Sequence, residues 1–282
     1  YAMCAWACGY YWNIIWLDTF ALLPLLIAGM VSLLRDGKFR LYTITLALSL
    51  WCSYYIAYFC CIFVLLCFIG YCILQPNGFV GFLRRFTRIG ICTLIGIAIA
   101  AVLLVPTLLA MQGTYSSEGK FPELLALNMV EGAYGTIGAD QTVWSMLTGQ
   151  TLPGLLTAAR KVLANLLPAG TVTSMDGLPN VFCGFATVLL AVSFCCNGKI
   201  RLREKLFSLA LLLLFLLSYT FRVLDYIWHG FHFPNMLPYR FSFLSCFVLI
   251  CMAYRAYTQL GRLKKWTLAV IGLIGAGLLV NG

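Results

Sequence analysis

The chain has 282 residues, of which 62% are hydrophobic and 10% charged, and its formal net charge is +10 at pH 7. A mean hydropathy of +0.93 excludes a soluble globular domain, in which about a quarter of the residues are charged. The basic residues alternate with long apolar runs and form no single stripe, which argues against a nucleic-acid partner. Apolar runs near the ~20 residues of a membrane-crossing helix predict an all-α polytopic membrane protein, and alternating strands typical of a closed barrel are not visible.

Residues 1–110 predict a first group of transmembrane helices, which opens with the end of a helix at 1–9. The apolar stretch 41–74 is too long for one helix, and "CSYY" at 52–55 divides it into a short and a long piece. The short piece is only ~18 Å long as a helix. We therefore expect crossings at 17–34, on both sides of 52–55, and at 89–110.

Residues 111–180 are too polar to cross a membrane and predict an extracytoplasmic segment. Within it, residues 153–168 carry their apolar side chains on one helical stripe, and Pro168 with Gly170 ends the helix. This pattern is typical of a helix that lies on the outer leaflet with its apolar face down. A helix packed on top of the bundle fits the same pattern.

Residues 181–282 predict a second transmembrane group, with crossings at 181–196, 206–222, 239–258 and 266–280. The whole chain then has about eight transmembrane helices plus an outer-face amphipathic helix. Four loops, at 35–40, 84–88, 199–205 and 255–265, hold fourteen Lys and Arg against two acids. By the positive-inside rule these loops face the cytoplasm, and the intervening connections, 223–238 among them, face outward.

The thirteen cysteines contain no CxxC pair, and most of them lie inside apolar runs. A cysteine in such a run behaves as a small hydrophobic residue. The pattern therefore favours packing over a disulfide framework or a metal cluster.

The stretch "WHGFHFPNMLPYRFSF", residues 228–243, is the strongest indication of a site, because it holds both histidines of the chain, His229 and His232. Arg240 stands at the start of the next apolar run, where it either snorkels at the helix end or binds an anion with its fork of donors. The two imidazoles are spaced for zinc, but no further ligand is near them in sequence. The aromatic residues of the stretch are typical of a membrane-interface belt: Trp228, Phe231, Phe233 and Tyr239.

Two acidic positions have local interpretations as well as functional ones. Asp18, in "NIIWLD", is expected to cap a helix or to interact with the dipole at its N-terminus, or else to reach a substrate from the outer side. Arg222 and Asp225, three residues apart, are expected to form a local ion pair. None of the nucleotide, serine-hydrolase or zinc-protease motifs of soluble enzymes occurs.

Three segments together resemble the YfhO-like family of bacterial multi-pass membrane proteins: "SYYIAYFCCIFVLLCF" (53–68), "GLPNVFCGFATVLLA" (177–191) and "WHGFHFPNMLPYRFSF" within 202–243. That family is similar in architecture to glycosyltransferases of the C-type membrane fold. The resemblance implies an inverting transfer at the outer face, from a polyprenyl-phosphate sugar to a cell-envelope polymer of the teichoic-acid type. It implies no cofactor, and a divalent metal stays open.

On this resemblance, Arg240 with His229 or His232 would hold the donor phosphate. Asn235 and Tyr239 would contact sugar or phosphate, and Asp18 is the best carboxylate for the catalytic base. Proteins of that fold carry their catalytic acid in the first outer loop, so we interpret the chain as a fragment of a larger bundle that begins beyond it. Ser53 also stands where the family pattern leads us to expect asparagine. A transporter or flippase of a lipid-linked or anionic solute, and a non-catalytic subunit of a cell-envelope complex, are the alternatives.

Overall fold

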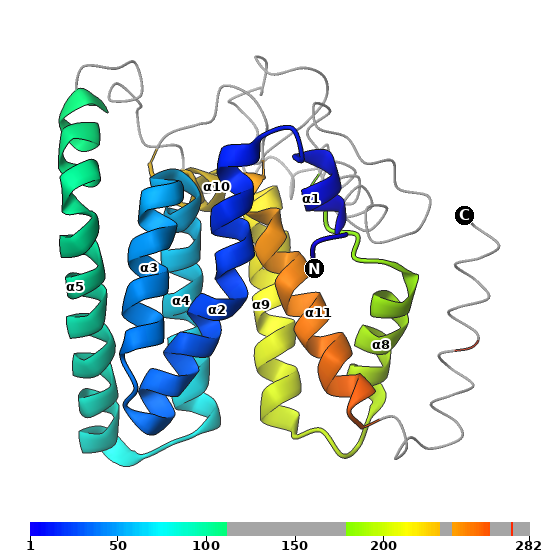
Figure 1. The fold of residues 1–282 in the computed structure, drawn as a ribbon. Helices are drawn as coiled ribbons and strands as arrows, with labels where there is room; N and C mark the ends of the chain where they lie inside the picture. The colour runs from blue at the N-terminus through cyan, green and yellow to red at the C-terminus, as the bar shows by residue number, and fades with distance from the viewer. Residues whose placement is uncertain (112–178, 232–238, 260–271, 273–282) are drawn as a thin grey trace, which may run out of the picture. The chain divides into compact units, whose positions relative to one another are not determined.

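The computed structural model describes residues 1–111, 179–231, 239–259 and 272, and every element in these ranges is a helix (Figure 1). They are α1 (Ala5–Gly9), α2 (Ile14–Asp36), α3 (Arg40–Cys52), α4 (Tyr54–Leu74), α5 (Gly78–Met111), α8 (Phe185–Cys196), α9 (Leu202–Thr220), α10 (Arg222–Trp228), the 3₁₀ helix η2 (Arg240–Ser242) and α11 (Phe243–Tyr257). The chain forms two compact units. The α2–α5 unit is residues 11–119, and the α8–α11 unit joins residues 1–10 to residues 120–282.

The α2–α5 unit confirms the predicted break in the long apolar stretch. Ser53, with φ −158° and ψ 98°, is extended and separates α3 from α4. At 13 residues α3 is the short piece that the sequence predicts. Between α2 and α3 the chain reverses at Gly37, whose φ of 73° is a left-handed conformation that glycine adopts without a steric penalty.

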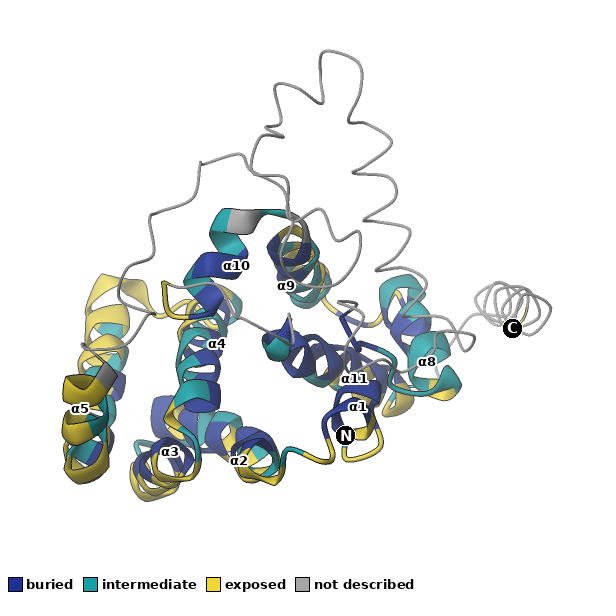
Figure 2. Ribbon diagram, turned by 90° about the horizontal axis from the view of Figure 1, so that it is seen from above, coloured by how far each residue is buried: buried dark blue, intermediate teal, exposed yellow. Residues whose placement is uncertain are grey.

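Helices α2 and α3 cross so closely that glycine is required at the contact. A Cβ atom built on Gly29 would lie 2.7 Å from the backbone nitrogen of Tyr42. Hydroxyl groups also join neighbouring helices: Thr19 Oγ1 of α2 donates to the carbonyl oxygen of Ser49 in α3 at 3.1 Å, and Tyr42 Oη of α3 lies 2.8 Å from Thr93 Oγ1 of α5. Figure 2 shows the buried sides of α2, α3 and α4 and the exposed side of α5.

The arginines at 84–88 lie inside α5, and the loop predicted for them is wrong. The helix begins at Gly78, so it extends about three turns before the apolar run. Arginine is a good helix former, and nothing in the first turns interrupts the helix. Arg85 still meets the preceding connection, because its guanidinium donates to the carbonyl oxygen of Gln75 at 2.5 Å and lies 5.1 Å from the ring of Tyr71.

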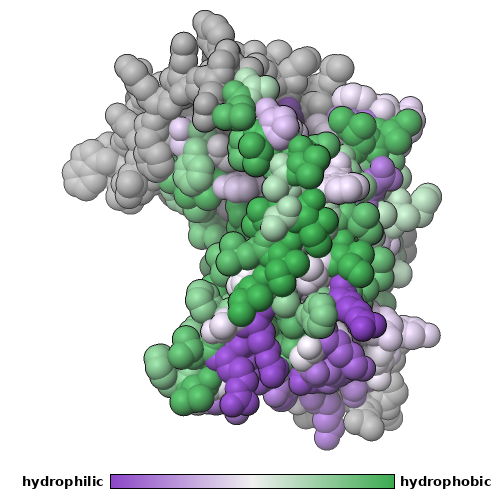
Figure 3. All heavy atoms as spheres, turned by 60° about the vertical axis from the view of Figure 1, so that its left-hand side comes forward, coloured by the Kyte–Doolittle hydropathy of each residue, from purple (hydrophilic) through white to green (hydrophobic). Residues whose placement is uncertain are grey.

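Both basic segments of the α2–α5 unit lie at the same end. Helices α2 and α4 run in one direction and α3 and α5 in the other, so residues 37–39 and 75–77 connect them at one end (Figure 1). Figure 3 shows hydrophilic side chains below a broad apolar surface on the face that it presents. This is the arrangement that the positive-inside rule requires.

Four described helical stretches are long and apolar enough to cross a membrane: α2, α4, α5 and the continuous stretch Arg240–Tyr257 of η2 and α11. Helix α8 is apolar but shorter, and it begins at Phe185 after a non-helical segment at 179–184. The predicted helical membrane fold is confirmed to this extent. The count of about eight crossings stays a prediction, and the helix at 153–168 and the crossing at 266–280 lie outside the described residues.

Candidate functional site

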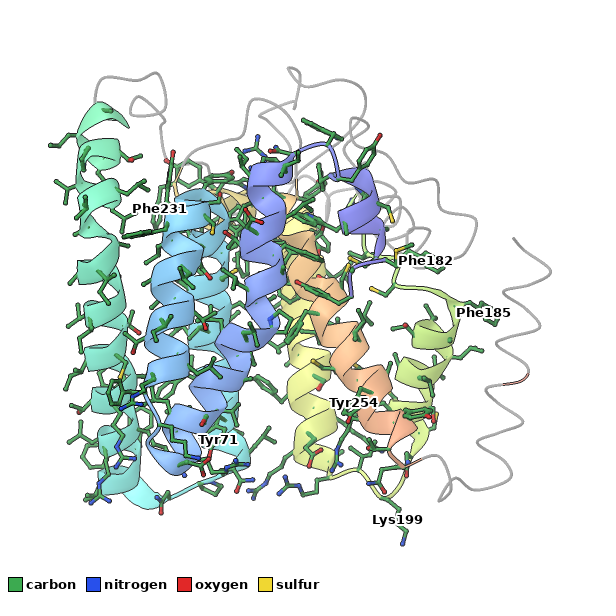
Figure 4. The ribbon with its side chains drawn as sticks, viewed as in Figure 1. Tyr71, Phe182, Phe185, Lys199, Phe231 and Tyr254 are labelled. Carbon is green, nitrogen blue, oxygen red and sulfur yellow. The ribbon has the colours of Figure 1, made fainter. Side chains whose placement is uncertain are left out.

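One end of the α8–α11 unit holds the basic residues of the α8–α9 connection and of the end of α11. Glu204, at the start of α9, accepts hydrogen bonds from Arg201 at 2.6 Å and from Arg255 of α11 at 3.1 Å. Figure 4 places Lys199 at this end of α8, and Phe182 and Phe185 at the other. We call the other end, made by residues 1–10, 179–185, 221–231 and 239–246, the outer end, because the positive-inside rule predicts that it faces away from the cytoplasm.

Arg240 lies at the outer end, and its backbone is fixed from two sides. Tyr239, immediately before it, has φ 55° and ψ 33°, a left-handed conformation that costs a non-glycine residue about 1–2 kcal/mol. The indole Nε1–H of Trp6, in α1, donates to the carbonyl oxygen of Arg240 at 2.8 Å. Trp6 is completely buried, and its ring packs on that of Phe243 with the centroids 5.0 Å apart.

The side chain of Arg240 is half-buried and acts on a tyrosine of the N-terminal segment. Burial raises the pKa of Tyr10 to about 12, and the positive charge of Arg240 acts in the opposite direction. Tyr10 is 2% exposed and packs on Trp6 with ring centroids 5.2 Å apart. A partly desolvated guanidinium interacts with an anion more strongly than one in bulk water.

His229 and Asp225 form a buried pair beside this position. Nδ1 of His229 lies 2.9 Å from the carbonyl oxygen of Asp225 and 3.1 Å from its carboxylate Oδ1. The imidazole is fully buried and the aspartate is 5% exposed. The predicted partner of Asp225 was Arg222; the structure gives the carboxylate a histidine neighbour one turn later, and the Arg222 side chain is outside the described part.

An aromatic cluster at the outer end includes two of the four residues predicted for an interfacial belt, and Phe233, another of the four, lies outside the described residues. The ring of Phe241 stacks on Trp228 at 4.9 Å and on Tyr219 at 5.3 Å, and His229 meets its edge at 5.8 Å. Trp228 and Tyr239 are each only 4% exposed, so these two belong to the core, whereas Phe231 is 56% exposed. The indole of Trp228 can be buried without leaving its N–H unpaired, because Nε1 donates to Ser218 Oγ at 2.9 Å.

Of the residues predicted for the site, the structure brings His229, Tyr239 and Arg240 to one end of one unit. His232 and Asn235 lie outside the described residues. Asp18 belongs to the α2–α5 unit, where it is exposed and is the fifth residue of α2. The N-cap of that helix is Asn13, so the interpretation of Asp18 as a cap is wrong, whereas its role as a base stays a prediction.

The sequence did not indicate Trp6 and Tyr10 as site residues. They lie about 230 residues before Arg240, and the only local signal is their i, i+4 spacing, which places both rings on one side of a helical turn. Within the described ranges no three His, Cys, Asp or Glu side chains are arranged to hold a metal ion.

Comparison with known proteins gives a family for the chain. The family described as "Bacterial membrane protein YfhO" matches residues 1–129 and 150–281 of the chain. No curated protein and no solved structure matches the chain. The family match covers most of the sequence, including all three segments quoted for the resemblance, and the protein therefore belongs to the YfhO family of bacterial membrane proteins.

Proposed function

We propose that this protein takes part in sugar transfer at the extracytoplasmic face of the bacterial cell membrane. The donor is a sugar linked to a polyprenyl phosphate in the membrane lipid phase, and the acceptor is a hydroxyl of a cell-envelope polymer such as teichoic acid. In the reaction the acceptor oxygen attacks the anomeric carbon, and the bond from that carbon to the phosphate oxygen breaks. The polyprenyl phosphate leaves with the bonding electrons, and a base takes the proton of the acceptor hydroxyl.

The single observation that supports this proposal is the placement of Arg240 at the outer end. Its charge is half-buried, and its backbone is fixed by Trp6 and by the left-handed Tyr239. A guanidinium held in this way offers parallel N–H donors to two phosphate oxygens. Negative charge grows on the phosphate as it leaves. The guanidinium therefore stabilises the transition state more than it stabilises the bound polyprenyl-phosphate sugar.

The other site residues have subsidiary roles in the proposal. His229, whose ring Asp225 orients, adds a second polar group beside Phe241, and His232 and Asn235 belong to the same connection. Tyr239 places Arg240 and is proposed to contact sugar or phosphate. Asp18, exposed on α2, is the carboxylate proposed as the base.

The test measures transfer in membranes that contain the full-length protein. Radiolabelled polyprenyl-phosphate sugars are supplied one at a time, and the label that enters cell-envelope polymer is measured over time. We expect Arg240→Ala to reduce the rate by about 100-fold, as the loss of a transition-state hydrogen-bond donor does. Arg240→Lys keeps the charge but loses the fork, and we expect an intermediate rate.

Arg203→Ala is the matched control, because it removes an exposed positive charge from the basic end of the same unit. Equal expression and equal thermal unfolding of the variants show that the fold is intact. An unchanged rate of transfer in Arg240→Ala would show that Arg240 does not bind the phosphate and only anchors the end of its helix. No transfer by the unaltered protein from any donor rejects the proposal in favour of a transporter or a non-catalytic subunit.

A further inference from the structure

An arginine of α5 covers the turn between α2 and α3. A Cβ atom built on Gly37 would lie 3.5 Å from Nη1 of Arg88 and 3.8 Å from its Cζ. Lys38 follows Gly37 in the turn, and Arg84 stands one helical turn before Arg88 on the same face of α5. All three basic side chains are exposed. We call Lys38, Arg84 and Arg88 the basic cluster, because they border one patch of surface at the basic end of the α2–α5 unit.

Acidic residues do not balance the charge of the basic cluster. From residue 1 to residue 117 the sequence has six Lys and Arg but only two acids, Asp18 and Asp36. Asp18 lies near the start of α2, at the opposite end of that helix. Both carboxylate oxygens of Asp36 accept hydrogen bonds from its neighbour Arg35, at 2.9 and 3.0 Å. Since the described part of the unit holds no further acid, the basic cluster offers three positive charges to an external anion.

The arginine between the two arginines of the cluster is engaged elsewhere. The guanidinium of Arg85 donates to the carbonyl oxygen of Gln75 at 2.5 Å and lies 5.1 Å from the ring of Tyr71, which Figure 4 shows at this end of the unit. Arg85 is also less exposed than Arg84 and Arg88. Neighbouring arginines of one helix therefore differ in the groups that their donors meet.

The basic cluster lies at the depth expected for lipid phosphate groups. Residues 89–110 of α5 include no charged residue. A helix of this length spans about 33 Å, which matches a hydrocarbon core of about 30 Å. Arg88 is thus at the border of the core, and the exposed Ile91 and Ile95 continue the same face of α5 into it. Figure 3 shows this change from hydrophilic to apolar surface.

We propose that the basic cluster binds the phosphate group of an anionic phospholipid in the cytoplasmic leaflet, and that the acyl chains of this lipid lie on the exposed apolar face of α5. The guanidinium groups offer paired donors to the phosphate oxygens, and Lys38 adds a point charge. Basic residues next to a membrane-crossing helix attract anionic lipids at the cytoplasmic surface. A free phosphate ion would meet the same donors but would gain nothing from Ile91 and Ile95.

The bound lipid would join α5 to the turn between α2 and α3 at the end that the positive-inside rule assigns to the cytoplasm. The proposed sugar transfer takes place at the other face of the membrane. This inference therefore does not depend on it, and each can fail without the other.

The test measures lipid binding to the full-length protein, purified in detergent, by native mass spectrometry. The probe is phosphatidylglycerol, and phosphatidylcholine with the same acyl chains is the comparison because its headgroup has no net charge. We expect phosphatidylglycerol to bind at least about tenfold more tightly. We expect Arg88→Ala and Arg84→Ala each to weaken phosphatidylglycerol about fivefold and to leave phosphatidylcholine unchanged.

Arg85→Ala is the matched control, because it removes the same charge from the same helix, and we expect a much smaller loss of affinity. Equal midpoints of thermal unfolding show that the variants are folded, and the comparison of the two lipids on the unaltered protein decides the outcome even if a variant is not. Equal affinity for both lipids would overturn the proposal, as would equal losses in Arg85→Ala and Arg88→Ala. Displacement of phosphatidylglycerol by an equal concentration of inorganic phosphate would assign the cluster to a free ion and would also overturn it.

Discussion

The indole N–H of Trp6 donates a hydrogen bond to the carbonyl oxygen of Arg240, 2.8 Å away and 234 positions later in the chain. This bond joins the N-terminal segment to the residue that the sequence makes the main candidate for anion binding. Because the bond is made to the backbone, it fixes the position from which the Arg240 side chain extends. The bond itself uses none of the N–H donors of the guanidinium.

Trp6→Phe tests this relationship. The phenyl ring can still pack on Phe243, but the carbonyl oxygen of Arg240 loses a buried donor, which costs about 1–3 kcal/mol. We expect a lower midpoint of thermal unfolding in detergent and a lower rate of sugar transfer. Thr19→Val is the control, because it removes a buried hydrogen bond to the carbonyl oxygen of Ser49 in the α2–α5 unit. It should lower the midpoint alone, and an equal loss of transfer in both variants would contradict a specific role for Trp6.

Gly29→Ala should destabilise the α2–α5 unit. Alanine normally favours a helix over glycine by about 1 kcal/mol, but here its Cβ would meet the backbone nitrogen of Tyr42 at 2.7 Å. Since backbone cannot move aside as a side chain can, we expect a net loss of about 1–3 kcal/mol. Gly90→Ala is the matched control, because a Cβ at that position of α5 meets nothing within 4 Å. The midpoints of thermal unfolding should therefore move in opposite directions, and a gain in both variants would show that α2 and α3 are not so close.

Sequence reasoning located the helices and the break at Ser53 because hydropathy, helix length and turn residues are local properties. It failed where tertiary contacts decide. Trp228 and Tyr239 fit an interfacial belt by composition, but the rings of Phe241 and Tyr219 surround them and make them core. No local pattern encodes the contact of Trp6 with Arg240, which depends on how distant segments pack.

The same limit applies to charged residues. Asp225 has an arginine three residues before it and a histidine four residues after it, and both spacings place a partner on the same helical face. The structure places the buried imidazole of His229 3.1 Å from the carboxylate, and the side chain of Arg222 lies outside the described part. The charge of the arginines at 84–88 likewise predicted a loop. Arginine has a high helix propensity, however, and α5 continues through these residues.

Glu204 predicts a pH dependence at the basic end. Burial raises the pKa of its carboxyl group, but the hydrogen bonds from Arg201 and Arg255 lower that pKa by more than burial raises it. The net pKa therefore lies below the usual value. The folded state is then stabilised fully above the unfolded-state pKa of about 4.3, and this contribution is lost as the pH falls through the lower folded-state pKa. Both arginines are largely exposed, so we expect only about 0.5–1 kcal/mol.

The check is the difference in unfolding midpoint between the unaltered protein and Glu204→Gln, measured from pH 7 down to pH 3. We expect a constant difference above about pH 5 that shrinks below it. Asp36→Asn serves as the control, since its pair with Arg35 is exposed and joins adjacent residues. A difference that grows toward low pH would have the wrong sign for this network.

The buried pair of His229 and Asp225 makes a prediction that a double-mutant cycle can measure. Asp225→Ala removes the carboxylate 3.1 Å from Nδ1 and leaves a fully enclosed imidazole beside a cavity, which we expect to cost about 3 kcal/mol. Asp225→Asn keeps the volume and a polar atom, and should cost about 1 kcal/mol. If the two side chains stabilise each other, His229→Ala should cost less when Asp225 is already alanine, with a coupling of about 1–3 kcal/mol. Additive midpoint changes in the cycle would instead leave the ring held by the Asp225 carbonyl oxygen and by Phe241, and the carboxylate would then be free for another role at the outer end.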